Sequence, residues 1–463
     1  MPTHHVIIGG GPAATNAVET IRQLGNGSSE ITLISDEPAH SRMALPYWLA
    51  QKIPRQHTMT ADEAFYQRLN VQPRIGTRVV KVDPQAQSLS LADDSQLKFD
   101  NLLIATGASP LSLPIPGADL PGVQPFWTLA HVQSVLDRLD GQDCPRVLFV
   151  GAGFIGFIVL GAMFKRGWQL SVVEREAHVL PRMLDADAAA IVQSWLDSQG
   201  VLVRCGATVQ SIREADDGAK VVQVADGKEL TADLVVIATG IRPNLELIDG
   251  AGVETDEAIL VNDRMQTNFP NIYAAGDVAQ GPVLFDDRSA VHAIQPTAVD
   301  HGRVAGANMA GREVHYPGSM SMNVVDVCGL QCVSFGNWSD PAAEAMTISN
   351  PSGSVYRKLL WTGDQITGAV FSGQAGDLGM LNDVGMVKGI MQTGTGLGAW
   401  KQFLAENPFD IRRPYVATGV AAKLAATTLL GEPTRDRQFR FGGAKPKAKL
   451  GPAHAAYVDA GGA

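Results

Sequence analysis

Two glycine-rich segments have spacings that would let the backbone approach a phosphate closely. Gly9-Gly10-Gly11-Pro12-Ala13-Ala14 has the spacing G-x-G-x-x-A, and Gly151-Ala152-Gly153-Phe154-Ile155-Gly156 has the complete spacing G-x-G-x-x-G. In such a segment the first glycine permits a tight turn, the second leaves room for a pyrophosphate, and the third small residue lets a helix pack close to a strand. The free N–H groups and the positive dipole end of that helix would face the phosphates.

An acidic residue follows each glycine-rich segment at a similar point. The strand-like run 31–34 leads into Ser35-Asp36-Glu37, and the run 170–173 leads into Glu174. A carboxylate in this place can accept hydrogen bonds from both hydroxyls of an adenosine ribose. The alternative is a glycine-rich turn without a ligand, but a strand before, a helix after and an acid at this distance favour a dinucleotide site.

The third repeated feature is a strand that ends in Ala-Thr-Gly. Residues 99–107 end in Ala105-Thr106-Gly107, and residues 234–240 end in the same three residues, with Gly240 last. Strand, fingerprint, acid, strand and Ala-Thr-Gly thus occur twice in the same order. The repeat predicts two dinucleotide sites that face one another.

Three further segments could complete a cofactor site. The strand 271–275 leads into Gly276-Asp277, where the acid could hold a sugar-alcohol chain by hydrogen bonds. The segment 40–48 mixes aromatic, cationic and proline residues. It is either a wall of the site, with Arg42 available to a phosphate or an acid, or a surface loop. Residues 292–309 are predicted to form a closely packed helix.

Composition limits the class of protein. The chain has 463 residues, of which 45% are hydrophobic and 18% charged, an ordinary globular balance. The net charge of −10 argues against a nucleic-acid partner. There is no run of about 18 apolar residues to predict a membrane span, and the first strand follows Met1 too closely for a signal peptide. The four cysteines are too widely placed for a disulfide framework, so we expect a cytoplasmic protein.

The ordered motifs resemble the two-dinucleotide-binding-domain flavoproteins, the pyridine nucleotide–disulfide oxidoreductase superfamily, over roughly residues 5–400. The resemblance implies an α/β fold with two Rossmann-like dinucleotide-binding domains, for FAD and for NAD(P)H, and a C-terminal α+β interface domain through which a homodimer could form. NADH is the preferred coenzyme, because Glu174 would repel the 2′-phosphate of NADPH. The predicted parts are 1–115 (FAD, first part), 116–241 (NAD(P)), 242–318 (FAD, second part), 319–405 (interface domain) and 406–463 (helical extension and mobile basic tail).

The resemblance also assigns roles to single residues. Glu37 would bind the adenosine ribose of FAD, Val80 would lie near its adenine, and Asp277 would hold its ribityl chain. The helix that starts near Gln295 would direct its N-terminus at the pyrimidine edge of the flavin. The residues expected at FAD are Gly9, Gly11, Pro12, Ala13, Ala14, Glu37, Arg42, Val80, Ala105, Thr106, Gly107, Gly276, Asp277, Gln295, Pro296 and Thr297. The residues expected at NAD(P)H are Gly151, Gly153, Phe154, Ile155, Gly156, Glu174 and Gly240.

The sequence departs from the family pattern at two positions. Residues 41–47 are similar to the NADH oxidase, coenzyme A disulfide reductase and NADH-dependent nitrite reductase branch, but Met43 stands where its thiol-using members carry a redox cysteine. A thioether cannot form a thiolate, so this single-cysteine chemistry is excluded. Ile158 stands where the family usually has a glutamate that contacts the nicotinamide carboxamide. Cys328 and Cys332 are either packed side chains beside a turn, which is favoured, or a redox pair.

We therefore expect an FAD-dependent NAD(P)H oxidoreductase in which the flavin is the redox centre and no side chain is catalytic. Electrons from NADH would pass to a redox protein or to a small oxidant such as a quinone or oxygen. The alternative, which Ile158 favours, is an FAD-binding subunit or module of a larger assembly with little NADH turnover of its own. Met43 disfavours a thiol-dependent peroxide or disulfide reductase.

The last part of the chain carries packing signals rather than chemical ones. Strands are expected within 323–335, 355–361 and 366–371, and a helix is expected over 378–392. The apolar residues of this helix fall at helical spacing, which predicts that they pack in a core. They are Leu378, Leu381, Val384, Val387 and Met391. From Thr434 the chain is polar and basic, and we expect a tail that is mobile or bound to a partner.

Overall fold

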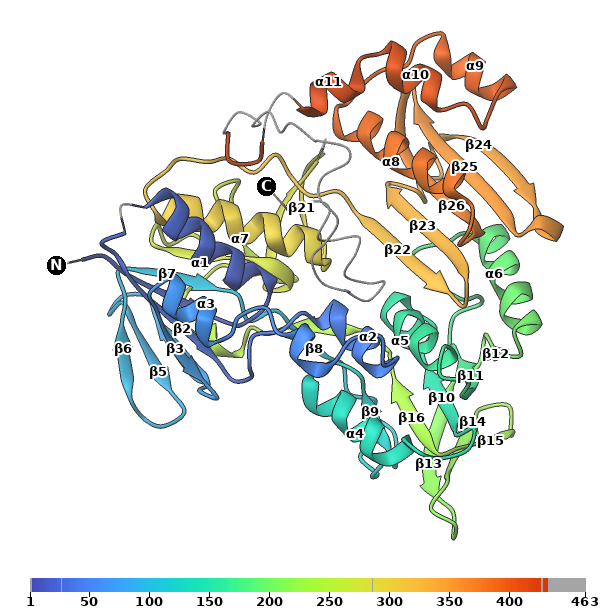
Figure 1. The fold of residues 1–463 in the computed structure, drawn as a ribbon, viewed down its shortest axis with the longest axis horizontal. Helices are drawn as coiled ribbons and strands as arrows, with labels where there is room; N and C mark the ends of the chain where they lie inside the picture. Colours follow the sequence, from blue (N-terminus) through green and yellow to red (C-terminus); the bar gives the residue numbers. More distant parts are fainter. Residues whose placement is uncertain (1, 26, 285, 426–427, 432–463) are drawn as a thin grey trace, which may run out of the picture.

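The computed structural model describes residues 2–25, 27–284, 286–425 and 428–431. Two parallel sheets and one antiparallel sheet, each with five strands, form the body of the described chain. Figure 1 shows the first parallel sheet at the left, the second at the lower right, and the antiparallel sheet with its helices at the upper right. The predicted α/β class is confirmed. The tail from Thr434 lies outside the described residues.

The first parallel sheet carries the first glycine-rich segment at the end of its central strand. Its strand order is β19-β7-β1-β2-β3, and all neighbouring pairs are parallel. Val6 and Ile7 on β1 are fully buried, as expected for a strand that is covered on both faces. The strands are β1 (His4–Ile8), β2 (Glu30–Ser35), β3 (Val71–Ile75), β7 (Asn101–Ile104) and β19 (Ile272–Ala274).

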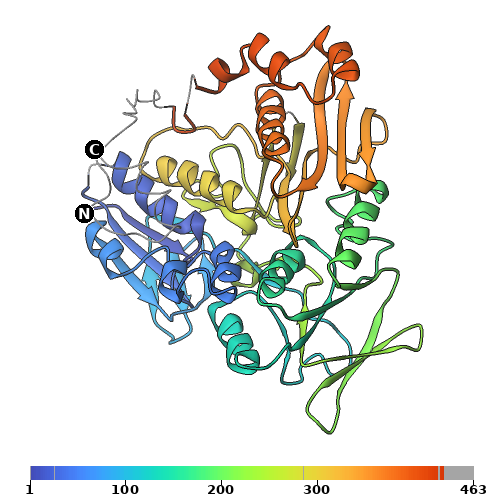
Figure 2. The same cartoon turned by 45° about the vertical axis from the view of Figure 1, so that its right-hand side comes forward.

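Two helices cover one face of this sheet in close contact. They are α1 (Pro12–Leu24) and α7 (Gln295–Met309), which lie side by side in Figures 1 and 2. A Cβ at Gly302 would lie 2.1 Å from Ala13 O, and a Cβ at Gly306 would lie 2.7 Å from Ala17 O. Glycine at these two places therefore lets the backbones of α1 and α7 touch. The predicted helix 292–309 is shorter than expected and begins at Gln295.

The second parallel sheet repeats the topology of the first and has the strand order β12-β11-β10-β16-β9. Gly9 N–H donates to Ile34 O at 2.7 Å in the first sheet, and Gly151 N–H donates to Val173 O at 2.8 Å in the second. The strands are β9 (Val123–Pro125), β10 (Arg146–Val150), β11 (Gln169–Val173), β12 (Leu202–Arg204) and β16 (Leu234–Ile237). The helices around it are α4 (Leu129–Leu139), α5 (Phe154–Phe164) and α6 (Ala186–Ser198).

Shorter elements connect and flank the two sheets. Each sheet is accompanied by a three-stranded antiparallel sheet, and one two-stranded sheet, β8 with β17, stands where the chain crosses between them. The first sheet is accompanied by η1 (Arg42–Ala44), α2 (Leu45–Leu49), η2 (Arg55–Thr58), α3 (Glu63–Arg68), β4 (Val79–Asp83), β5 (Ser88–Leu91), β6 (Gln96–Lys98), β8 (Ala108–Pro110) and η4 (Gly276–Val278). The remainder are β13 (Val209–Glu214), β14 (Lys220–Val224), β15 (Glu229–Ala232), β17 (Ile241–Pro243), η3 (Glu246–Ile248), β18 (Ile259–Leu260), β20 (Ala279–Val283) and β21 (Asp286–Ala290).

The C-terminal part is an antiparallel sheet covered by helices. Its strand order is β22-β23-β26-β25-β24, and β24 is a strand that the sequence pattern did not predict. The strands are β22 (Met322–Val327), β23 (Leu330–Gly336), β24 (Glu344–Asn350), β25 (Val355–Thr362) and β26 (Gln365–Gln374), with η5 (Pro351–Gly353) between two of them. The helices are α8 (Leu378–Gln392), α9 (Trp400–Glu406), α10 (Arg412–Ala417) and α11 (Val420–Ala425).

The expected helix 378–392 has the predicted bounds, but the burial predicted for its apolar residues is only half right. Val384, Val387 and Met391 are buried, whereas Leu378 is 70% and Leu381 is 38% exposed. Helices α10 and α11 pack against α8, and a Cβ at Gly389, in its second half, would contact side chains of these helices. Among the described residues, the two leucines of the first turn of α8 remain exposed.

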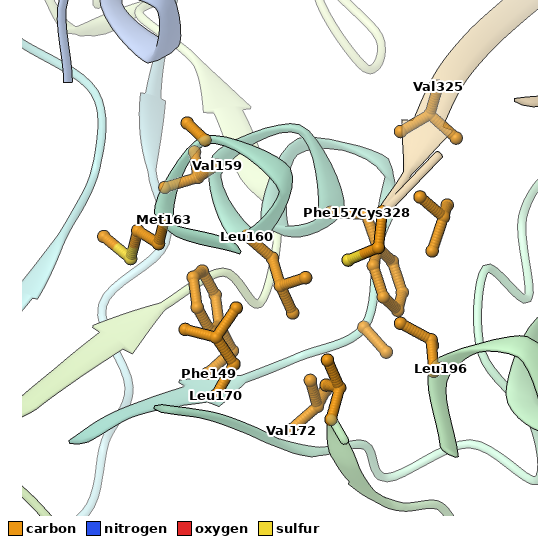
Figure 3. Close-up of a cluster of buried hydrophobic side chains, with 14 of the residues drawn as sticks. Phe149, Phe157, Val159, Leu160, Met163, Leu170, Val172, Leu196, Val325 and Cys328 are labelled. Atoms are coloured by element: carbon orange, nitrogen blue, oxygen red, sulfur yellow. The ribbon is translucent and has the colours of Figure 1, made fainter. Parts of the chain in front are cut away.

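Helix α5, which follows the second glycine-rich segment, is buried between two sheets. Its sequence is apolar on every side, and one face packs against β10 and β11 while another meets β22 of the C-terminal sheet (Figure 3). A Cβ at Gly161 would lie 3.1 Å from Asp326 O, which shows how closely α5 and β22 approach. The C-terminal sheet is thus anchored on the helix that would present the second dinucleotide site.

Candidate functional site

The first glycine-rich segment closes a tight turn between β1 and α1. Gly9 has φ +120°, and a Cβ there would lie 2.1 Å from Ala105 O, so only glycine fits. A Cβ at Gly11, in contrast, would meet no atom of the described residues within 4 Å. The space in front of the N-terminus of α1 is therefore open at the place where a pyrophosphate would bind.

Glu37, Arg42 and Trp127 form a connected group beyond the end of β2. The carboxylate of Glu37 accepts a hydrogen bond from Arg42 Nη2 at 3.1 Å. Arg42 Nη1 donates to Trp127 O at 3.0 Å, and the guanidinium lies 4.7 Å from the centre of the Trp127 ring. Burial lowers the pKa of Arg42, while the carboxylates of Glu37, Asp277 and Asp36 oppose this effect. Arg42 thus places a positive charge among the acids of the site, where it suits a phosphate.

Asp277 lies at the end of β19, in the short helix η4. Its neighbour Gly276 has φ +80°, and a Cβ there would lie 3.4 Å from Ala13 Cβ, so this turn rests on the start of α1. Burial raises the pKa of Asp277, and the charge of Arg42 works in the opposite direction. Among the described residues, the structure assigns no hydrogen bond to this carboxylate. It is free to accept hydrogen bonds from hydroxyl groups of a ligand.

The start of α7 and the first Ala-Thr-Gly turn complete this side of the site. Ser41 Oγ donates to Gln295 Oε1 at 3.1 Å, so the segment before α2 is tied to the first residue of α7. Asn244 Nδ2 donates to Thr106 O at 2.8 Å, and Thr106 Oγ1 donates to Asn244 O at 3.2 Å. Asn244 is a site residue that no sequence motif predicted. Its place shortly after the second Ala-Thr-Gly turn is the one signal that could have identified it.

The second glycine-rich segment repeats the geometry of the first. Gly151 has φ +104°, and a Cβ there would lie 2.4 Å from Ala238 O. A Cβ at Gly153 would meet no atom of the described residues within 4 Å. The N-terminus of α5 therefore also faces open space, as the pairing of two dinucleotide sites requires.

Glu174, the acid predicted for this second site, is held against the fingerprint. Its carboxylate is buried and accepts hydrogen bonds from Ala152 N–H at 2.5 Å and Glu176 N–H at 2.8 Å. A carboxylate has about four acceptor positions, so this geometry leaves capacity for ribose hydroxyls.

The structure also describes the other predicted site residues. Val80 on β4 is 48% exposed, and Gly107 and Gly240 both have positive φ. Ile158 on α5 is half-buried and packs against the core that contains Phe157 and residues of α2. Three groups of predicted residues stand in the first turns of helices: Pro12, Ala13 and Ala14 in α1, Phe154, Ile155 and Gly156 in α5, and Pro296 and Thr297 in α7.

The four cysteines do not gather at the flavin segment. Cys328 in the turn after β22 and Cys332 in β23 are both buried and free, which agrees with the packing interpretation. Burial raises the pKa of the Cys328 thiol to about 12 and also raises that of Cys332, so neither is a ready thiolate. Met43, which the sequence resemblance predicts at the position of a redox cysteine, is 43% exposed in η1.

Replacement of all four cysteines should leave electron transfer intact. We expect a variant with Ser or Ala at Cys144, Cys205, Cys328 and Cys332 to keep FAD and to reduce its acceptor at the wild-type rate. Burial raises the pKa of Cys205, Cys328 and Cys332, and the charge of Glu174 adds to this effect at Cys205, so none of these three is a ready thiolate. Circular dichroism would first establish that the variant folds, since two of the cysteines are buried. A folded, FAD-loaded variant that no longer reduces its acceptor would reveal a thiol relay.

The described part of the chain contains neither a candidate membrane span nor a candidate metal site. No helix there combines the length and the apolar character that a membrane crossing needs. No group of three or more His, Cys, Asp or Glu side chains is placed there to hold a metal ion.

Comparison with known proteins decides the family. Residues 3–302 match the model of the pyridine nucleotide-disulphide oxidoreductase family. The chain belongs to this family. Its members are FAD-containing, NAD(P)H-dependent oxidoreductases, so FAD and NAD(P)H are the cofactors and the protein is an enzyme of this class. The open glycine turns, Arg42 and the Asp277 carboxylate, which has no hydrogen-bond partner among the described residues, fit these cofactors.

Two relatives illustrate the range of the family. The chain is 35% identical over 320 residues to the NADH oxidase of Methanocaldococcus jannaschii. The matched region covers 67% of this chain and 71% of that oxidase. It is 28% identical over 416 residues to the NADH-dependent phenylglyoxylate dehydrogenase subunit epsilon of Aromatoleum evansii. This matched region covers 89% of this chain and 96% of that subunit. The chain spans only about half the length of two further curated relatives from Bacillus subtilis. The matched regions cover 46% and 48% of those two proteins.

A solved structure supports the fold over nearly the whole chain. The similarity to the putidaredoxin reductase in a covalent complex with putidaredoxin has a TM-score of 0.80 at 23% sequence identity. It covers 90% of this chain and 99% of the other. The two-site architecture and the C-terminal sheet therefore occur together in a known fold.

Proposed function

We propose that this enzyme oxidises NADH at FAD and passes the electrons to a separate redox protein, without a redox-active cysteine. The observation that carries the proposal is the pair of open turns at Gly11 and Gly153, at equivalent ends of two parallel sheets. Bound FAD supplies a ring that accepts a hydride and releases electrons singly or in pairs. The chain binds and orients the two cofactors, and Met43 in place of a cysteine supports direct transfer from the flavin site.

Each group of the first site has a distinct task in this proposal. The N–H groups at the start of α1 and the guanidinium of Arg42 would neutralise the pyrophosphate of FAD. Glu37 would exchange its bond to Arg42 for the adenosine ribose hydroxyls, and Asp277 would accept from the ribityl chain. The N-terminus of α7, at Gln295, would favour negative charge on the pyrimidine edge of the flavin.

NADH should bind more tightly than NADPH. The carboxylate of Glu174 is fixed by two backbone N–H groups, where it would accept from a ribose 2′-hydroxyl and repel a 2′-phosphate. Arg175 beside it donates to Glu176 Oε1 at 2.9 Å, so its guanidinium is less available to bind a phosphate. Titration of the purified protein with each coenzyme gives the two dissociation constants. A lower constant for NADPH would show that this assignment of Glu174 is wrong.

Turnover with different acceptors tests the proposed acceptor class. The enzyme would be supplied with NADH and, in separate reactions, with a [2Fe–2S] ferredoxin, with the neutral quinone menadione, or with oxygen alone. The proposal expects the ferredoxin to be reduced with the highest kcat/KM. Turnover that is fastest with oxygen, and is not increased by ferredoxin, would instead assign the chain to the oxidase type.

A second candidate function is a flavoprotein subunit that turns over NADH slowly outside its assembly. The match to a dehydrogenase subunit over nearly its whole length favours it, and so does Ile158 in place of an acid. The two candidate functions predict different behaviour of the bound flavin when the isolated chain is mixed with NADH. Fast reduction of the bound flavin by NADH supports the free-standing reductase, and flavin that stays oxidised supports the subunit.

A further inference from the structure

The segment from Pro38 to Ala61 has a charge distribution that is unusual for this acidic protein. It contains no Asp or Glu, although it carries Arg42, Lys52 and Arg55 in a chain with a net charge of −10. Another long acid-free run, 144–173, forms the buried elements β10, α5 and β11. In the segment 38–61 the cationic residues Lys52 and Arg55 are exposed. The segment therefore carries a net positive charge of its own on a negative molecule.

Apolar side chains are exposed on the same segment. Tyr47 on α2 is 58% exposed and Met43 in η1 is 43% exposed. They stand one helical turn apart in the chain, and Lys52 and Arg55 follow soon after. The Arg55 guanidinium lies 5.8 Å from the centre of the Trp48 ring, a contact that limits the positions of this side chain. Exposed aromatic, methionine and arginine side chains with few acids are the composition that protein interfaces favour.

The surface is continuous with the first cofactor site. Arg42 directly precedes Met43 and is bonded to Glu37, and Ser41 is bonded to Gln295 at the start of α7. The other side of α2 packs against α4 and α5, which belong to the second parallel sheet. A protein bound over Met43 and Tyr47 would therefore sit beside the FAD site, on the exposed side of α2.

We propose that the surface formed by Met43, Tyr47, Lys52 and Arg55, the docking surface, binds an acidic one-electron carrier protein. The inference rests on the proposed function, because the carrier is the acceptor of the electrons from NADH. A hydride carries two electrons, so one NADH reduces two carriers and leaves NAD⁺ and one proton. Attraction between Lys52, Arg55 and the acids of the carrier would speed encounter and orient it toward the flavin site.

A charge-reversed pair of variants tests the docking surface. The first is Lys52→Glu/Arg55→Glu, and the matched control is Lys98→Glu/Arg412→Glu, which makes the same change in net charge at exposed cations on β6 and α10. The probes are an acidic [2Fe–2S] ferredoxin and the neutral quinone menadione, each with saturating NADH. We expect the first variant to raise the KM for ferredoxin roughly tenfold or more at low salt, while its rate with menadione and its FAD content stay at the wild-type level.

Salt and the control variant give the second readout. The KM of the wild type for ferredoxin should rise steeply with salt, because screening weakens the attraction, and that rise should be much smaller in the docking-surface variant. An equal effect of the control variant would mean that only net charge matters, and an unchanged KM in the first variant would place the carrier elsewhere; either result overturns the inference. Failure of NADH to reduce menadione or the flavin in the wild type would instead overturn the proposed function.

Discussion

Replacement of Ile158 by glutamate should speed the reduction of bound FAD by NADH roughly ten- to a hundredfold. The sequence resemblance predicts an acid at this position on α5, where it would contact the nicotinamide carboxamide. Such a charge-assisted hydrogen bond is worth about 1.5–3 kcal/mol, and it would act on the rate if it forms only in the stacked geometry. Ile158 is half-buried, so the helix exposes enough of this position to accept a longer polar side chain.

Burial of the new carboxylate is the competing cost. Phe157 beside it is fully buried, and the apolar surroundings of α5 would raise the pKa of a glutamate here and weaken its charge. Ile158→Gln is the matched control, because it offers an amide oxygen without charge. Stopped-flow reduction at equal FAD content should rank Glu above Gln and both above the wild type. A folded Ile158→Glu variant that is slower would show that Ile158 serves a different arrangement, such as a partner contact.

Gly11→Val should fold and yet lose FAD, whereas Gly153→Val should fold, keep FAD and lose NADH binding. A Cβ at either glycine meets no atom of the described residues within 4 Å, and both have φ near −80°, which other residues adopt freely. The added side chain would instead occupy the space assigned to a pyrophosphate. The two cofactors should therefore be lost independently, each with the glycine of its own sheet.

FAD content and the NADH dissociation constant measure these two effects. Flavin absorbance against protein concentration should fall from about one FAD per chain to near zero in Gly11→Val, and the NADH constant should rise roughly a hundredfold in Gly153→Val. Gly9→Val is the control for folding, because its Cβ would lie 2.1 Å from Ala105 O at φ +120° and should prevent a stable fold. Retention of FAD by a folded Gly11→Val variant would contradict the assigned site.

The parts of the fold that local chemistry dictates could be predicted from the sequence. In both fingerprints the first glycine is required by a close backbone contact, and the second glycine faces open space. The apolar runs before them form buried central strands. Glu174 could be predicted because an acid one residue past such a strand lies against the fingerprint by geometry alone. Each of these features follows from the repeated order of strand, glycine turn, helix and strand, so spacing along the chain is enough to identify it.

The remaining features depend on contacts that no local pattern records. Trp127 lies 85 residues after Arg42 in the chain, so the Arg42–Trp127 contact follows from the packing of the two parallel sheets. The contact of α5 with β22 likewise depends on tertiary packing, here between the second parallel sheet and the C-terminal sheet. Leu378 and Leu381 have the spacing of core residues, but their exposure is decided by where α10 and α11 end. Periodicity indicates which face of a helix is apolar, and only tertiary packing determines whether that face is covered along its whole length.

Anaerobic mixing of the purified, yellow protein with NADH tests the central claim most directly. Denaturation should first release a non-covalent flavin that chromatography identifies as FAD. In the stopped-flow experiment, stoichiometric NADH should bleach the flavin absorbance in a single turnover, and NADPH at the same concentration should bleach it more slowly. Flavin absorbance that stays unchanged with both coenzymes, in a protein that holds FAD, would contradict the account of this chain as an NADH-oxidising flavoenzyme.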